Sequence, residues 1–154
     1  MPSHEEKRVL PFSTSEMFSV VSDVERYPEF VPGCAALRIL ERESDGGVET
    51  IVAKMKVAFG GLSESYKSKV VLDRKNGTVE ACHLEGPFDH LDTRWRISRR
   101  DLGSEVHFKI DFAFRNPLLA AASNLVFDQI VQKMTDAFVA RAAQLHQASH
   151  QAQQ

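Results

Sequence analysis

The sequence has only two cysteines in 154 residues, Cys34 and Cys82, and they lie far apart in the chain. Two cysteines are too few for a small secreted scaffold held by disulfides, and their spacing does not match a zinc motif. One disulfide between them stays open from the sequence alone. Buried thiols in a reducing cytosol are the favoured interpretation.

Long hydrophobic runs are also missing. No stretch approaches the roughly 18 apolar residues that a membrane-spanning helix needs. Residues 1–8 are polar and charged, so they do not resemble a secretory signal. We therefore expect a cytoplasmic protein, peripheral to the inner membrane where it contacts one.

The chain has neither an excess of positive charge nor a recognisable catalytic motif. Its 19 lysines and arginines against 21 acidic residues give a formal net charge of -2, which argues against a general nucleic-acid binder. It lacks a Gly-x-Ser-x-Gly elbow, a glycine-rich phosphate loop and a paired metal motif. We predict no catalytic residues, no metal site, no required cofactor and no specific DNA binding.

A long amphipathic helix is the clearest feature that the sequence does have. It is predicted from Asn116 and Pro117, which are favoured residues at a helix start, to about Leu145. Apolar residues recur along it at three- or four-residue spacing. Residues 1–146 are predicted to form a single domain, followed by a polar tail, residues 147–154, that frays.

The rest of the chain predicts strands and two short helices. Residues 4–10 read as a strand, Ser13 and Glu16 form a capping box, and a second short helix from Asp23 stops before Pro28. Residues 27–32 and residues 86–90 read as apolar loops stiffened by proline. Six strand candidates follow residue 32, separated by short hairpin turns, so the strands should be antiparallel. Apolar and polar residues alternate in residues 51–59 and 105–114, which predicts one buried and one solvent-facing side for each of these strands.

This order predicts an α+β fold, in which a curved antiparallel sheet of about seven strands wraps around the C-terminal helix. It is the helix-grip arrangement of the START and birch-pollen-allergen-like superfamily. The local sequence resembles coenzyme Q-binding proteins and their bacterial relatives, which are described as polyketide cyclase-like or as ribosome-association toxins. The resemblance rests on residues 8–13, 17–18, 23–25, 27–32, 86–88 with Leu91 and Trp95, and 112–119. Its most specific segments are Tyr-Pro-x-Phe-Val-Pro and Phe-x-Asn-Pro-Leu. Two departures are Gly33, where the family often has Trp, and Ala113, where it often has Glu.

The resemblance implies that a polyprenyl quinone such as ubiquinone occupies a cavity between sheet and helix, in support of respiratory electron transport. Phe30, Val31, Pro87 and Phe88 could form an apolar lip at the cavity or could simply plug the core. Glu64 falls on the inward face of its strand and could meet a quinone head group. A strand that frays or bulges after Gly60-Gly61 would leave Glu64 in water, and this is the favoured interpretation. The predicted ligand-binding residues of cavity and lip are Phe30, Val31, Met55, Glu64, Tyr66, Phe88, Leu91, Trp95, Phe127, Val131, Met134 and Phe138.

The opposite face of the sheet carries a candidate basic contact surface. Lys54, Lys56, Lys67 and Lys69 could gather on adjacent strands and meet anionic lipid or ribosomal RNA. Acidic residues interleave with them, so a solvated face of mixed charge is the favoured interpretation.

We conclude from the sequence that the protein binds and chaperones a hydrophobic small molecule without catalysis. A ribosome-associating, toxin-like factor that hinders subunit joining is the first alternative. A polyketide cyclase or aromatase is the second. It would need Glu64 or Tyr66 as its acid or base.

Overall fold

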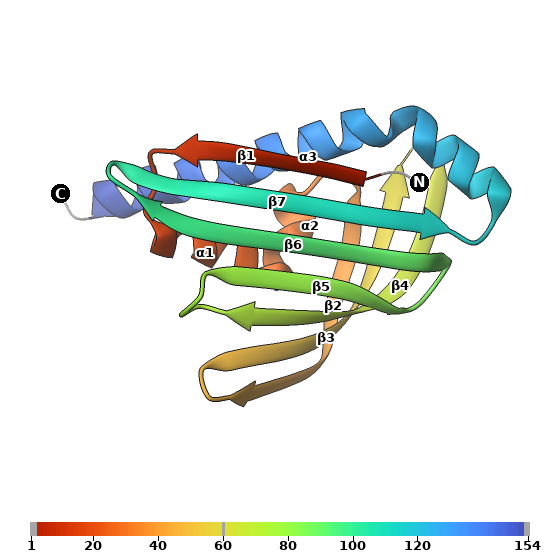
Figure 1. Ribbon diagram of the computed structural model, residues 1–154, viewed down its shortest axis with the longest axis horizontal. Coiled ribbons are helices and arrows are strands. Elements are labelled where there is room, and N and C mark those ends of the chain that lie inside the picture. Colours follow the sequence, from red (N-terminus) through yellow and green to blue (C-terminus); the bar gives the residue numbers. More distant parts are fainter. Residues whose placement is uncertain (1–2, 60, 153–154) are drawn as a thin grey trace.

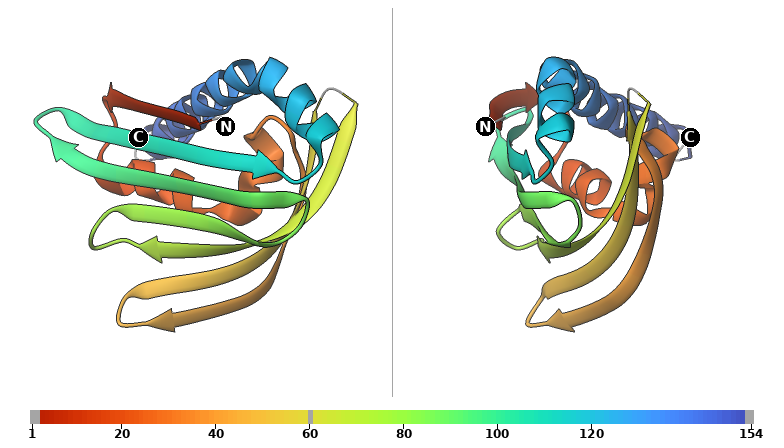
Figure 2. Two further views of the ribbon diagram at one scale, coloured as in Figure 1. Left: turned by 45° about the vertical axis from the view of Figure 1, so that its right-hand side comes forward. Right: turned by 90° about the vertical axis from the view of Figure 1, so that its right-hand side faces the viewer.

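The computed structural model describes residues 3–59 and 61–152. Within them, seven antiparallel strands form a single sheet in the order β1-β7-β6-β5-β4-β3-β2. The sheet curves strongly, and its concave face holds the helices (Figures 1 and 2). The strands are β1 (Ser3–Leu10), β2 (Cys34–Asp45), β3 (Val48–Phe59), β4 (Leu62–Asp73), β5 (Thr78–Glu85), β6 (Phe88–Arg100) and β7 (Gly103–Phe114).

Three short helical segments carry the chain from one edge of the sheet to the other. They are α1 (Thr14–Ser22), the 3-10 turn η1 (Val24–Arg26) and α2 (Tyr27–Phe30), and they connect edge strand β1 to edge strand β2. The long helix α3 (Pro117–Ala152) follows β7. The observed order confirms the predicted α+β helix-grip fold with its seven-stranded sheet.

The two predicted helix starts are confirmed by their caps. The Ser13 hydroxyl accepts a hydrogen bond from the Glu16 amide, and the Glu16 carboxylate accepts one from the Ser13 amide, each at 3.1 Å. At the start of α3, the Asn116 side chain accepts a hydrogen bond from the Leu118 amide at 2.8 Å. Such caps satisfy amides that have no partner within the helix.

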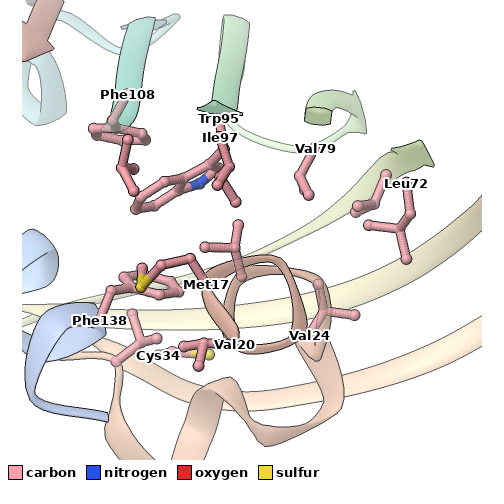
Figure 3. Close-up of a cluster of buried hydrophobic side chains, with 14 of the residues drawn as sticks. Met17, Val20, Val24, Cys34, Leu72, Val79, Trp95, Ile97, Phe108 and Phe138 are labelled. Atoms are coloured by element: carbon pink, nitrogen blue, oxygen red, sulfur yellow. The ribbon is translucent and has the colours of Figure 1, made fainter. Parts of the chain in front are cut away.

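The core lies between the concave face of the sheet and the helices. Met17 and Val21 of α1 are almost completely buried, as is Phe108 of β7. Figure 3 shows Trp95 and Phe108 of the sheet facing Met17 and the α3 residue Phe138 across this core. Alternation along β7 buries one side of the strand and leaves the other toward solvent, as its sequence pattern predicts.

Three predicted boundaries are wrong. Residues 27–30 form α2 rather than a loop, because Pro28 lies in the first turn of that helix, where its missing N–H is not needed. Strand β6 begins at Phe88, so residues 88–90 are strand and not loop. Helix α3 continues past Leu145 to Ala152, since no proline or glycine interrupts it.

The domain boundary at residue 146 and the fraying of the tail stay predictions. Residues 153 and 154 of that tail lie outside the described part of the chain.

Candidate functional site

A two-lobed cavity lies between the sheet and the helices. Each lobe has a volume of about 150 Å³. Six of the described residues line both lobes, so the two are neighbouring compartments of one site. These shared residues are Val31, Met55, Tyr66, Leu91, Ile110 and Met134.

The outer lobe lies where β6 begins and β7 ends, and aromatic rings form much of its surface. Phe88 stacks on Phe114 with ring centroids 4.6 Å apart, and Phe112 lies 5.1 Å from Phe127 of α3. The turn that precedes β2 contributes Pro32, Gly33 and Cys34 to the same lobe. Phenylalanines of two strands therefore meet about two turns of the long helix, residues 127–134.

The inner lobe lies between α2 and the middle of the sheet. Trp95 packs between Phe108, at 4.4 Å, and Phe138, at 4.7 Å between ring centroids. Val24, Leu37 and Val79 also line this lobe. Apolar side chains make up most of both lobes, as in cavities that bind hydrophobic ligands.

Helix α2 is held over the inner lobe by contacts with α3. Tyr27 and Phe30 each pack edge-on against Phe138, at 5.3 and 5.2 Å. The Arg141 guanidinium lies 5.2 Å above the Phe30 ring and forms an ion pair with Glu29 at 3.2 Å. These contacts make α2 the cover of this part of the cavity.

Few polar groups line the two lobes. The Ser68 hydroxyl donates to the Cys82 carbonyl at 3.2 Å, and the Tyr27 hydroxyl donates to the Val21 carbonyl. The Tyr66 hydroxyl contacts the Met55 sulfur at 3.5 Å. Burial raises the pKa of both tyrosines and raises the pKa of the Cys34 thiol to about 11, so all three stay protonated at neutral pH.

Most of the residues predicted for ligand binding lie at this cavity. Val31, Met55, Tyr66, Leu91 and Met134 line both lobes. Phe88, Phe127 and Val131 line the outer lobe, and Trp95 and Phe138 line the inner one. That these residues contact a ligand stays a prediction.

Phe30 and Glu64 lie beside the cavity and line neither lobe as described. The pairing between β3 and β4 is regular, so no bulge between these two strands turns Glu64 away from the inward face. Glu64 pairs directly with Val57, which lines the outer lobe, and is half-buried. Its carboxylate therefore lies on the cavity side of the sheet, beyond the lobes themselves.

The lip residues divide between surface and core. Phe88 is only 5% exposed and Val31 9% exposed, so both belong to the core that surrounds the cavity. Phe30 and Pro87 are half-buried. For Phe88 and Val31, the interpretation as a core plug agrees with the structure better than that of an exposed lip.

Sequence reasoning missed part of the cavity lining. Ile110, Phe112 and Phe114 share the inward face of β7, so alternation could have added them to the site. The sequence marks Gly33 only as a departure from the family pattern, and no periodic signal marks Cys34. Both enter through the turn before β2. Gly33 has a φ of +84°, which a tryptophan would adopt only with strain. Ala113 lies between two inward-facing phenylalanines of β7, so it belongs to the opposite face.

The convex face of the sheet carries the four predicted lysines. Lys54 and Lys67 pair directly across β3 and β4, and Arg38 of β2 pairs with Lys54 on the other side. Lys67 forms an ion pair with Glu85 at 3.1 Å. Lys69 borders a groove of about 430 Å³ that also holds Glu80 and Asp92. The face is thus a row of cations within a surface of mixed charge.

Neither a metal centre nor a membrane span is found in the part of the chain that the structure describes. No group of three or more His, Cys, Asp or Glu side chains there is placed to hold a metal ion. Among the same residues, no helix is both long and apolar enough to cross a bilayer.

Comparison with known proteins places this arrangement in a family. A model described as "Polyketide cyclase / dehydrase and lipid transport" matches residues 10–139. Ribosome association toxin RatA of Escherichia coli (strain K12) is 32% identical over 151 residues, covering 96% of this chain and 91% of that protein. Mitochondrial coenzyme Q-binding protein coq10 of Schizosaccharomyces pombe is 33% identical over 142 residues, covering 90% and 85%.

Solved structures share the fold. The 18 kDa protein CC1736 from Caulobacter crescentus matches with a TM-score of 0.80 and 35% identity, covering 95% of this chain and 99% of that one. A START superfamily protein from Mycobacterium smegmatis matches with a TM-score of 0.77 at 19% identity, covering 93% and 98%. The chain therefore belongs to the polyketide cyclase / dehydrase and lipid transport family and has the START helix-grip fold.

Proposed function

We propose that this protein binds and shields a hydrophobic small molecule without catalysis, and that the ligand is a polyprenyl quinone such as ubiquinone. The observation that carries the proposal is the two-lobed apolar cavity between α3 and the sheet. A relative that is 33% identical is named a coenzyme Q-binding protein, which supports the choice of ligand. In the cell, such a carrier would support respiratory electron transport.

The size of the cavity limits how the ligand can sit. Two lobes of about 150 Å³ each reach the lower end of the ~300–1,000 Å³ typical of ligand pockets. They suit a quinone ring with the first part of its chain, while the remaining chain extends out of the cavity. Each Å² of apolar ligand surface removed from water contributes about 25 cal/mol.

The residues that line the cavity favour ligand binding over catalysis. A cyclase needs a polar acid and base facing the substrate. Glu64 lies beyond the lobes, and burial keeps the Tyr66 hydroxyl protonated. Tyr66 therefore lacks the carboxylate partner that the enzymatic alternative requires.

A cavity-filling substitution tests the binding function. Met134 borders both lobes, so Met134→Trp should occlude them and lower retained quinone at least tenfold. Lys133→Trp introduces the same side chain one residue away, at an exposed position, and should retain the wild-type amount. Both are measured by adding ubiquinone, removing the excess by gel filtration and quantifying quinone per protein. Equal retention by the two variants would rule out the cavity as the binding site.

Ribosome association is the second candidate function. Like charges directly opposite each other on neighbouring strands are destabilising, and Arg38, Lys54 and Lys67 form such a row. A polyanion bound across the row would relieve this repulsion. The relative named a ribosome association toxin supports the same idea.

Charge reversal tests the ribosome hypothesis. Changing Lys54, Lys56, Lys67 and Lys69 together to Glu should abolish co-sedimentation with ribosomes, if this face binds ribosomal RNA. The Met134→Trp variant should still co-sediment, because it leaves the convex face unchanged. Undiminished co-sedimentation of the four-fold variant would reject this face as the contact surface.

A further inference from the structure

We propose that the Tyr66 hydroxyl is the polar recognition point of the cavity, and that it donates a hydrogen bond to a carbonyl oxygen of a neutral ligand seated between the two lobes. This inference rests on the proposed binding function and adds the ligand's chemical class and orientation. It makes Tyr66 the residue that distinguishes a quinone from a plain hydrocarbon.

The position of Tyr66 is the first argument. It is one of the residues that line both lobes, so its hydroxyl can reach a group at the junction between them. The Phe88 ring packs edge-on against it at 5.2 Å. Gly86 lies so close behind that a Cβ there would be 2.5 Å from the Cβ of Tyr66. The tyrosine is thus fixed from two sides.

The hydrogen-bond partners are the second argument. The hydroxyls of Tyr27 and Ser68 already donate to backbone carbonyls, which are strong acceptors. Thr93 lines only the inner lobe and does not border the junction, as Tyr66 does. The Tyr66 hydroxyl instead contacts the thioether sulfur of Met55 at 3.5 Å, and thioether sulfur is a weak acceptor. A ligand carbonyl would be a stronger hydrogen-bond acceptor for the Tyr66 hydroxyl than this sulfur. The hydroxyls of Tyr27 and Ser68 would not exchange a weak acceptor for a stronger one.

The charge of the site is the third argument. Among the described residues that line the two lobes there is no lysine, arginine, histidine, aspartate or glutamate. His83 and Glu64 flank the cavity, and Arg141 is paired with Glu29 outside it. A buried ligand carboxylate would have no counter-ion and would be costly. The site therefore favours neutral ligands that carry an acceptor oxygen over fatty-acid anions.

These three arguments predict the orientation of the bound ligand in the cavity. With a carbonyl at Tyr66, a quinone ring occupies the junction beside Met55 and Met134. Its apolar chain then follows the phenylalanine-rich outer lobe. The cover formed by α2 and Phe138 closes the inner end.

The test compares three probes in two variants. Decylubiquinone, decylbenzene and myristate are measured by their displacement of diphenylhexatriene, a fluorescent hydrocarbon, from the purified protein. The wild type should prefer decylubiquinone. Tyr66→Phe should weaken decylubiquinone about tenfold, the loss expected for one buried hydrogen bond, and leave decylbenzene within about twofold. Ser65→Ala is the matched control, because it removes a hydroxyl from the neighbouring, exposed position of β4, which lines neither lobe, and it should not change the preference.

The other possible results of this displacement test show which part of the proposal is wrong. If Tyr66→Phe leaves decylubiquinone unchanged, or weakens both neutral probes equally, Tyr66 is not the recognition residue, although the binding function stands. If myristate binds the wild type better than decylubiquinone, the inference of a neutral ligand is overturned. If the wild type binds none of the probes, the proposed function fails and this inference fails with it.

Discussion

At the scale of single residues, the question is whether a side chain at the cavity is exposed as a lip or buried in the core. Phe88 is the clearest case. Its ring stacks on Phe114 and packs edge-on against Tyr66 and Phe112. The sequence could not place it, because an aromatic residue after Gly-Pro fits an exposed lip and a core plug equally well. Burial depends on which strands surround the ring, and that information is not local.

Truncation of Phe88 distinguishes the two roles. Phe88→Ala should lower the free energy of unfolding by about 3–5 kcal/mol, the range for large-to-small changes of buried phenylalanine. Urea denaturation of the ligand-free protein measures the loss. A surface lip would give a change within about 0.5 kcal/mol. Leu118→Ala is the control, because Leu118 is 80% exposed and should show that smaller value.

At the scale of helices and strands, the sequence predicted the type of each element better than the residues at which it begins and ends. The capping box at Ser13, the Asn-Pro start of α3 and the alternation in β3 and β7 are local signals, and all of these elements form as expected. Helix α2 was missed because Pro28 was taken as the stop of one helix rather than as part of the first turn of the next. Helix α3 extends beyond the expected end at Leu145, because a polar composition does not by itself end a helix.

The same limits apply to the site. The sequence predicted Met55, Tyr66 and Trp95 as residues of the cavity lining, and the structure places all three at the cavity. The turn residues Gly33 and Cys34 have no periodic signal. Glu64 faces the cavity side as alternation predicts, yet only the three-dimensional extent of the lobes shows that it lies beyond them.

The contact between α1 and α3 predicts how the stability of the fold depends on pH. Glu16 of the α1 capping box also pairs with His146 of α3. Partial burial opposes ionisation of Glu16, but hydrogen bonds from His146 and Ser13 outweigh it, so the pKa of this carboxyl is lowered from its ordinary value of 4.5. A lowered pKa in the folded state means that ionised Glu16 stabilises the fold.

This stabilisation should be fully present above about pH 4.5 and should be lost as the pH falls through the lower, folded-state pKa. Glu16→Gln removes the titrating group. Its melting temperature should therefore be lower than that of the wild type at pH 7, and the gap should narrow toward pH 3. Glu43→Gln, at an exposed position of β2, is the control and should follow the wild type. A gap that stays constant with pH would contradict the account.

For the whole molecule, the curved sheet gives its two faces different chemistry. Helix α3 lies against the concave face of the sheet (Figure 2). That face encloses an apolar cavity, while the convex face carries cations and acids side by side. Ligand binding and ribosome contact would therefore use opposite surfaces. A net charge of -2 gives no general attraction to nucleic acid, so ribosome contact would depend on the local row of cations.

The central claim is that the cavity holds a neutral polyprenyl quinone. The most direct measurement is organic extraction of the natively purified protein, followed by mass spectrometry of the extract. The account predicts close to one polyprenyl quinone per protein molecule, and much less from Met134→Trp prepared in the same way. An extract without quinone, from a wild-type protein that also takes up no added ubiquinone, would contradict it.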